Sequence, residues 1–76
     1  MKLPVLSGKE LLKILCNQFG FAVVEQHGSH VILTGNRDGI KLKPVVPMHP
    51  EIAKGTLLSI LKQASLTRQD LENALK

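Results

Sequence analysis

The chain has 76 residues, with ten Lys and Arg against six Asp and Glu, which gives a formal net charge of +4. This length predicts one domain, residues 1–76, whose small core leaves any site on the surface. Aromatic residues make up 3% of the chain, Phe19 and Phe21 alone, which excludes a platform of several stacked rings for single-stranded bases. The positive charge fits an acidic partner, most commonly nucleic acid, and fits a merely soluble surface equally well.

The lone cysteine, Cys16, excludes an intrachain disulfide and a thiolate metal cage. Its position in an apolar helical pattern predicts a core residue. The opening segment, residues 1–6, is too short for the apolar region of a signal peptide, and no apolar run approaches the roughly 20 residues that cross a bilayer. We therefore expect a cytoplasmic protein that does not contact a membrane.

The first predicted element is a helix that begins after Ser7. Ser7 and Glu10 have the spacing of a capping box, and Leu6 and Leu11 occupy the positions of a hydrophobic staple. Apolar residues then recur at helical spacing as far as residue 19. Gly20 follows and is expected to end the helix, because glycine readily adopts the left-handed conformation found there.

Three strands are predicted next, over residues 21–26, 29–34 and 40–46. A tight turn at His27 and Gly28 joins the first two, and a hairpin loop over residues 35–39 joins the last two. Such short connections predict an antiparallel meander.

Alternation along the second and third strands assigns their side chains to two faces. We expect the apolar set to face the helices: Val31, Leu33, Ile40 and Leu42. We expect the outer face to carry the polar set: His30, Thr34, Lys41 and Lys43. Ile32 also belongs to the outer face, where an apolar residue indicates a surface for a partner.

After an extended connector over residues 46–50, a second helix is predicted from Lys54 to Ala64. Thr67 and Asp70 then resemble a second capping box, which predicts a short third helix to about Leu75. The predicted fold class is α+β, in the order α-β-β-β-α of a double-stranded-RNA-binding domain. It has a three-stranded antiparallel sheet with helices on one face, and a short C-terminal helix is added.

Candidate chemistry rests on histidine. The carboxylates are scattered, no phosphate-binding loop or dinucleotide fingerprint is present, and a metal site is disfavoured because no cysteine or carboxylate accompanies the histidines. We expect no metal and no cofactor. Histidine titrates near neutral pH and can exchange protons at a phosphate-binding surface. Composition alone, however, favours the alternative that His30 is a strand residue that hydrogen-bonds a neighbour. His27 and His49 are weaker candidates.

The predicted start of the second helix carries Lys54, Gly55 and Thr56, a cation, a glycine and a hydroxyl. Helix N-termini bind phosphate through their unsatisfied N–H groups and the helix dipole. These residues are therefore candidates for RNA binding, with simple capping of the helix as the alternative.

Three segments together resemble the HicA toxins of bacterial HicA–HicB toxin–antitoxin systems. They are Gly28-Ser29-His30, Val46-Pro47-Met48-His49-Pro50, and the run from Lys54 to Ala64. The resemblance implies a double-stranded-RNA-binding-like fold, metal-independent cleavage of messenger RNA, and neutralisation by a HicB-type antitoxin. It also implies that His30 is the catalytic acid or base, with Gly28 and Ser29 as the turn that shapes the site.

The chain departs from the family pattern at two positions. Many members have a second histidine where this chain has Val31, and many have glycine where it has Ser65, which is a less suitable residue for ending a helix. Two other readings of the sequence remain. One is a non-catalytic RNA-binding module with the same fold, and the other is a pure interaction protein that binds another protein through the face around Ile32.

Overall fold

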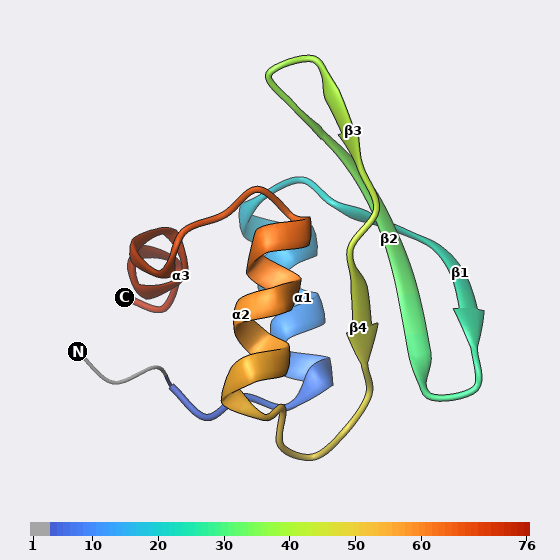
Figure 1. Ribbon diagram of the computed structural model, residues 1–76, viewed down its shortest axis with the longest axis vertical. Coiled ribbons are helices and arrows are strands. Elements are labelled where there is room, and N and C mark those ends of the chain that lie inside the picture. Colours follow the sequence, from blue (N-terminus) through green and yellow to red (C-terminus); the bar gives the residue numbers. More distant parts are fainter. Residues whose placement is uncertain (1–3) are drawn as a thin grey trace.

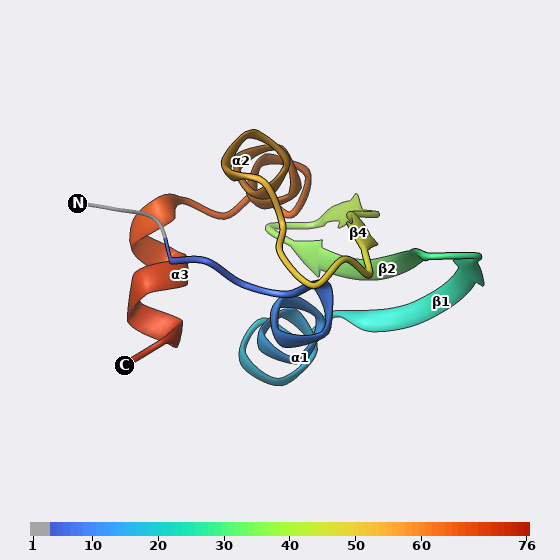
Figure 2. The same cartoon turned by 90° about the horizontal axis from the view of Figure 1, so that it is seen from below.

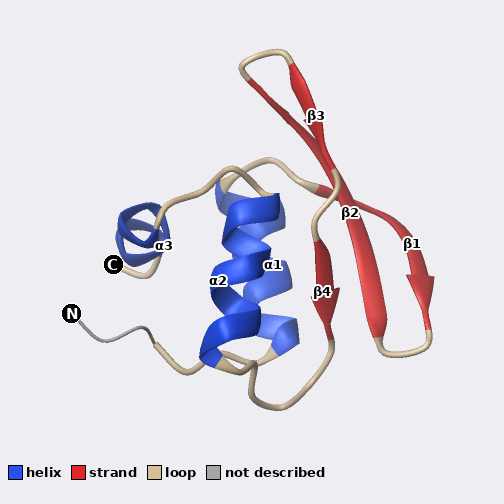
Figure 3. Cartoon of the chain, in the orientation of Figure 1, coloured by secondary structure: helices blue, strands red, loops and turns tan. Residues whose placement is uncertain are grey.

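The computed structural model describes residues 4–76, so residues 1–3, part of the opening segment considered above, lie outside it. Its elements, in chain order, are α1 (Gly8–Gln18), β1 (Ala22–His27), β2 (His30–Arg37), β3 (Ile40–Leu42), β4 (Val45–Pro47), α2 (Lys54–Gln63) and α3 (Arg68–Ala74). Figures 1 and 3 show the sheet beside the pair α1 and α2. The fold is α+β and has the order of a double-stranded-RNA-binding domain, as expected.

Helix α1 begins as the sequence predicts. The Ser7 hydroxyl accepts from the Glu10 amide, and the Glu10 carboxylate accepts from the Ser7 amide, each at 3.1 Å. Leu6 and Leu11, the predicted staple pair, are both buried. Gly20 follows the helix with a φ of +74°, which confirms its role in ending α1.

Strand β2 is the centre of the sheet and pairs antiparallel with the three other strands. Its first half lies between β1 and β4, and its second half pairs with β3. Asp38 and Gly39 join β2 to β3 with positive φ values of 52° and 79°, as in the two-residue turns that suit a twisted hairpin. The predicted loop over residues 35–39 is thus shorter than expected, since Gly35, Asn36 and Arg37 continue β2.

The third predicted strand is two strands in the structure, β3 and β4, with a break at residues 43 and 44. Pro44 causes the interruption, because proline has no backbone N–H to donate to a ladder. Its carbonyl oxygen still accepts from the Leu33 amide at 2.9 Å, which keeps the segment against β2. The sheet therefore has four strands in place of the three predicted, along the same path.

One assignment to the inner face is wrong. Val31 and Leu33 are buried and Leu42 packs against the core, as expected, but Ile40 is 61% exposed. Figure 1 shows the reason: the β2–β3 hairpin extends beyond the ends of α1 and α2, so no helix covers Ile40.

The helices form two layers on the same side of the sheet. α1 and α2 pack against it, and α3 lies on the far side of this pair (Figure 2). The Val45 amide donates to the side-chain oxygen of Gln63 at 3.1 Å and so ties β4 to α2. Thr67 and Asp70 form the predicted capping box of α3. Cys16 is partly buried against the core, and this burial raises the pKa of its thiol.

Candidate functional site

The turn between β1 and β2 presents His30. Gly28 has a φ of +58°, which glycine adopts without strain. Its carbonyl oxygen accepts from the side-chain amide of Gln26 at 3.2 Å. The Ser29 carbonyl accepts from the Met48 amide at 2.6 Å, so the turn is bonded to the segment after β4. Gly28 and Ser29 thus set the backbone from which His30 projects.

His30 lies on the outer face of the sheet. Its neighbour Val31 is 3% exposed and points into the core, and successive strand residues alternate between faces. His30 itself is exposed, and within residues 4–76 its imidazole makes no hydrogen bond or ion pair. The alternative in which His30 bonds to a neighbouring residue is therefore not what the structure has. The exposed imidazole is therefore accessible to a ligand.

His27 lies directly opposite His30 in the β1–β2 ladder. Directly opposed residues of an antiparallel pair share one face, so both imidazoles belong to the outer face. His27 Nε2 is 2.8 Å from Glu25 Oε1, and both side chains are largely exposed, so a carboxylate does accompany this histidine, contrary to the expectation from the sequence. The turn consists of Gly28 and Ser29, one residue later than predicted, so His27 ends β1 instead of lying in the turn.

His49 reaches the same end of the sheet, although it is distant along the chain. Its carbonyl oxygen accepts from the Gly8 amide at 2.9 Å, one residue beyond the bond between Met48 and Ser29. Its side chain is exposed. Within the described residues, no group of three or more His, Cys, Asp or Glu side chains is arranged to hold a metal ion.

Lys41 and Lys43 do not join His30 in one compact site. Lys41 lies opposite Asn36, six residues along β2 from His30 and therefore about 20 Å away at the usual rise of a strand. Asn36 alternates in phase with His30, so Lys41 is on the predicted face but at its far end. Lys43 is exposed in the break between β3 and β4.

Lys54, Gly55 and Thr56 form the first turn of α2, at the same end of the molecule as the β1–β2 turn (Figure 1). The residue that precedes this turn is Ala53, which supplies no side-chain hydrogen bond, and the turn contains no acidic residue. The alternative that Gly55 and Thr56 cap the helix is therefore wrong. All three residues are exposed, and nothing lies within 4 Å of the position a Cβ would take on Gly55.

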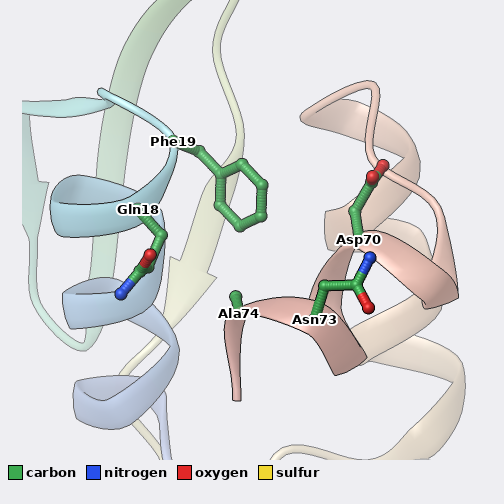
Figure 4. Close-up of a pocket in the computed structure, with 5 residues that line it drawn as sticks. All are labelled: Gln18, Phe19, Asp70, Asn73 and Ala74. Atoms are coloured by element: carbon green, nitrogen blue, oxygen red, sulfur yellow. The ribbon is translucent and has the colours of Figure 1, made fainter. Parts of the chain in front are cut away.

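Two surface hollows in the described part of the chain lie away from His30. One, of about 220 Å³, is lined by Gln18 and Phe19 of the α1 end and by Asp70, Asn73 and Ala74 of α3 (Figure 4). Another is lined by Thr67, which caps α3, and by residues of α3. Neither contains a histidine, and the Asp70 carboxylate is occupied by the cap of α3. The candidate site, on the exposed strand surface around His30, lies in neither of these two hollows.

The chain is thus a small basic α+β domain with the element order of a double-stranded-RNA-binding domain and an exposed histidine beside a strand turn. Residues 8–66, most of the chain, match the family model described as the HicA toxin of bacterial toxin–antitoxin systems, and the chain belongs to that family. No curated protein and no solved structure matches the chain. Within the described residues, no helix is long and apolar enough to span a membrane.

Proposed function

We propose that the chain is the toxin of a HicA–HicB pair and acts as an endoribonuclease that cuts messenger RNA in the cytoplasm, without a metal ion. The observation that carries this proposal is the presentation of His30. The Gly28-Ser29 turn holds its backbone, and its imidazole is exposed without a partner in the described part of the chain.

RNA cleavage requires little beyond proton transfer. The 2′-hydroxyl is a nucleophile already present in the substrate, and His30 supplies the acid or base that exchanges its proton. Positive groups stabilise the charge that develops on the phosphate. The open surface suits this task, because a polymer strand must reach the histidine without entering a cavity.

Basic residues at both ends of the domain support binding of an extended RNA. Lys41 lies about 20 Å from His30, a span of several nucleotides, and Lys43 lies between Lys41 and His30 along β2, so both would contact phosphates away from the cut. Lys54, Gly55 and Thr56 present an uncapped helix start at the near end. In this proposal these five residues bind phosphates and do not read bases.

A HicB-type antitoxin is the proposed protein partner. Ile32, half-buried, alternates in phase with His30 on the outer face and offers an apolar contact beside it. A basic surface suits an acidic inhibitor. We propose that the antitoxin covers this face and makes His30 inaccessible. A structure of the complex with His30 open to solvent would contradict the occlusion.

Induced expression in bacterial cells tests the proposed function. The wild-type chain should arrest growth and shorten messenger RNA, and His30→Ala should do neither at equal protein level. His49→Ala is the matched control, because His49 is an exposed histidine at the same end whose described contact uses its backbone, and it should remain toxic. Growth arrest by His30→Ala with intact messages would favour the non-catalytic RNA-binding module.

A further inference from the structure

Cleavage through the 2′-hydroxyl involves two proton transfers at two different oxygens. A base removes the proton of the attacking 2′-oxygen, and an acid donates one to the departing 5′-oxygen. Because the attacking and leaving oxygens lie roughly in line on opposite sides of phosphorus, two separate groups serve them best. His30 accounts for one group, so the neighbouring surface is where the other belongs.

The sheet register identifies what lies beside His30. Its partner on β4 is Pro47, which cannot transfer a proton, and its partner on β1 is His27. Directly opposed residues have Cβ atoms about 4.5–5.5 Å apart, so the two imidazoles can reach one phosphate group. Ile32, the next residue on this face of β2, is apolar and lies opposite Glu25, which already contacts His27.

The contact with Glu25 gives His27 a defined orientation. Nε2 of His27 lies 2.8 Å from Glu25 Oε1, a contact in which Nε2 donates to the carboxylate and Nδ1 is left for another partner. A carboxylate that contacts one ring nitrogen in this way orients the imidazole, as in hydrolytic triads. His27 and Glu25 are 66% and 56% exposed, so a substrate can reach them.

We propose that His27 is the general acid of the reaction and that Glu25 is its positioning residue, an inference that rests on the proposed function. His30 takes the proton of the 2′-hydroxyl as the 2′-oxygen bonds to phosphorus. The bond from phosphorus to the 5′-oxygen breaks, and His27 gives its proton to that oxygen. The products are a 2′,3′-cyclic phosphate and a 5′-hydroxyl end, with His30 protonated and His27 neutral, and solvent restores both.

A substrate with an altered leaving group separates this role from others. The cut site in a short RNA is first mapped with the wild-type protein. A second RNA of the same sequence is then made with sulfur in place of the 5′-bridging oxygen at that site. A thiolate departs without a proton, so a general acid is dispensable on the sulfur substrate. His27→Ala should lose about 10²–10⁴ in kcat on ordinary RNA, the usual contribution of general acid catalysis, and should match the wild type on the sulfur substrate.

Three further variants complete the test. His30→Ala should fail on both substrates, because both need the base. Glu25→Gln should show a smaller loss on ordinary RNA and none on the sulfur substrate, and His49→Ala should behave as wild type. The exposed pair of Glu25 and His27 contributes little to stability, so circular dichroism should find every variant folded.

The inference fails if His27→Ala cuts ordinary RNA at the wild-type rate or loses activity equally on both substrates. The assignment would also be overturned if the sulfur substrate restored the activity of His30→Ala but not that of His27→Ala. In each of these cases the proposed function still holds, provided that cleavage of ordinary RNA depends on His30. A wild-type protein that cuts no RNA overturns both.

Discussion

The backbone amide of Leu66 donates a hydrogen bond of 2.8 Å to the carbonyl oxygen of Leu61 and closes the turn that ends α2. A second bond, from the Ser65 amide to the Lys62 carbonyl, completes a Schellman motif. Ser65 holds the left-handed position in it, with a φ of +56°, where many family members have glycine. The turn is therefore as sharp with Ser65 as with glycine, but the backbone of Ser65 is strained.

Ser65→Gly is therefore expected to stabilise the protein. Relief of the left-handed conformation should add about 1 kcal/mol to the free energy of unfolding, which raises Tm by roughly 4–8 °C in a domain of this size. Ser59→Gly is the matched control, since Ser59 is exposed within α2 and glycine there should cost about 0.5 kcal/mol. Thermal unfolding of both variants checks the prediction, and a loss of stability in Ser65→Gly would contradict it.

Gly8 and Gly55 should respond in opposite ways to alanine. A Cβ on Gly8 would overlap the Pro47 carbonyl oxygen and lie 2.7 Å from the Cα of Met48, both backbone atoms. Gly8→Ala should therefore cost about 1–3 kcal/mol through overpacking. Gly55→Ala meets no atom and should add about 0.4–1 kcal/mol. Chemical denaturation measures both, and equal effects would mean that α1 is not packed so closely against the end of β4.

The cap of α3 predicts a dependence of stability on pH. The hydrogen bond from the Thr67 backbone, then that from its hydroxyl, and last the charge of Arg37 hold the pKa of the Asp70 carboxyl below its ordinary value of 3.8. A carboxyl group whose pKa is lower in the folded state stabilises the protein above its unfolded pKa and loses this effect as pH falls through the folded value.

Asp70→Asn should accordingly have a lower Tm than the wild type at pH 7. The difference should narrow as pH falls below 3.8, because the wild-type carboxyl then becomes neutral too. Thermal unfolding of both proteins across this pH range measures it. A Tm difference that stays constant throughout would show that the charge of Asp70 does not matter to the cap.

Local signals in the sequence predict much of the fold. The capping boxes at Ser7 and Thr67 and the turn at Gly28 each depend on residues within one turn of one another. The break at Pro44 is not predicted by strand periodicity, because periodicity takes no account of the backbone N–H that proline lacks. Exposure of Ile40 depends on how far the helices reach along the sheet, a property that no local pattern contains.

The sequence likewise predicts some features of the candidate site and not others. The outward direction of His30 follows from alternation with Val31, and the sequence predicts it. The separation of Lys41 from His30 and the arrival of His49 at the same end depend on strand register and on the path after β4. Alternation assigns a face to a residue but not a position along that face.

Loss of Lys41 and Lys43 should weaken binding to all RNA sequences alike. With His30→Ala as the background to prevent cleavage, the added double change to alanine should reduce affinity and flatten its dependence on salt. The logarithmic slope should fall by about 0.7 for each lost contact with a single-strand phosphate. Lys13→Ala, at an exposed position on α1, is the control. An unchanged slope in the double variant would show that the lysines of β3 and of the segment after it do not contact the RNA.

Cleavage of a defined RNA by the purified protein in excess chelator tests the central claim most directly. The wild type should cut the RNA with the metal removed and should leave intact a substrate that has a 2′-deoxy sugar at the cut site. His30→Ala, folded as judged by circular dichroism, should be slower by at least about 10². Full activity in His30→Ala, or wild-type activity that disappears with the chelator, would contradict a mechanism based on this histidine.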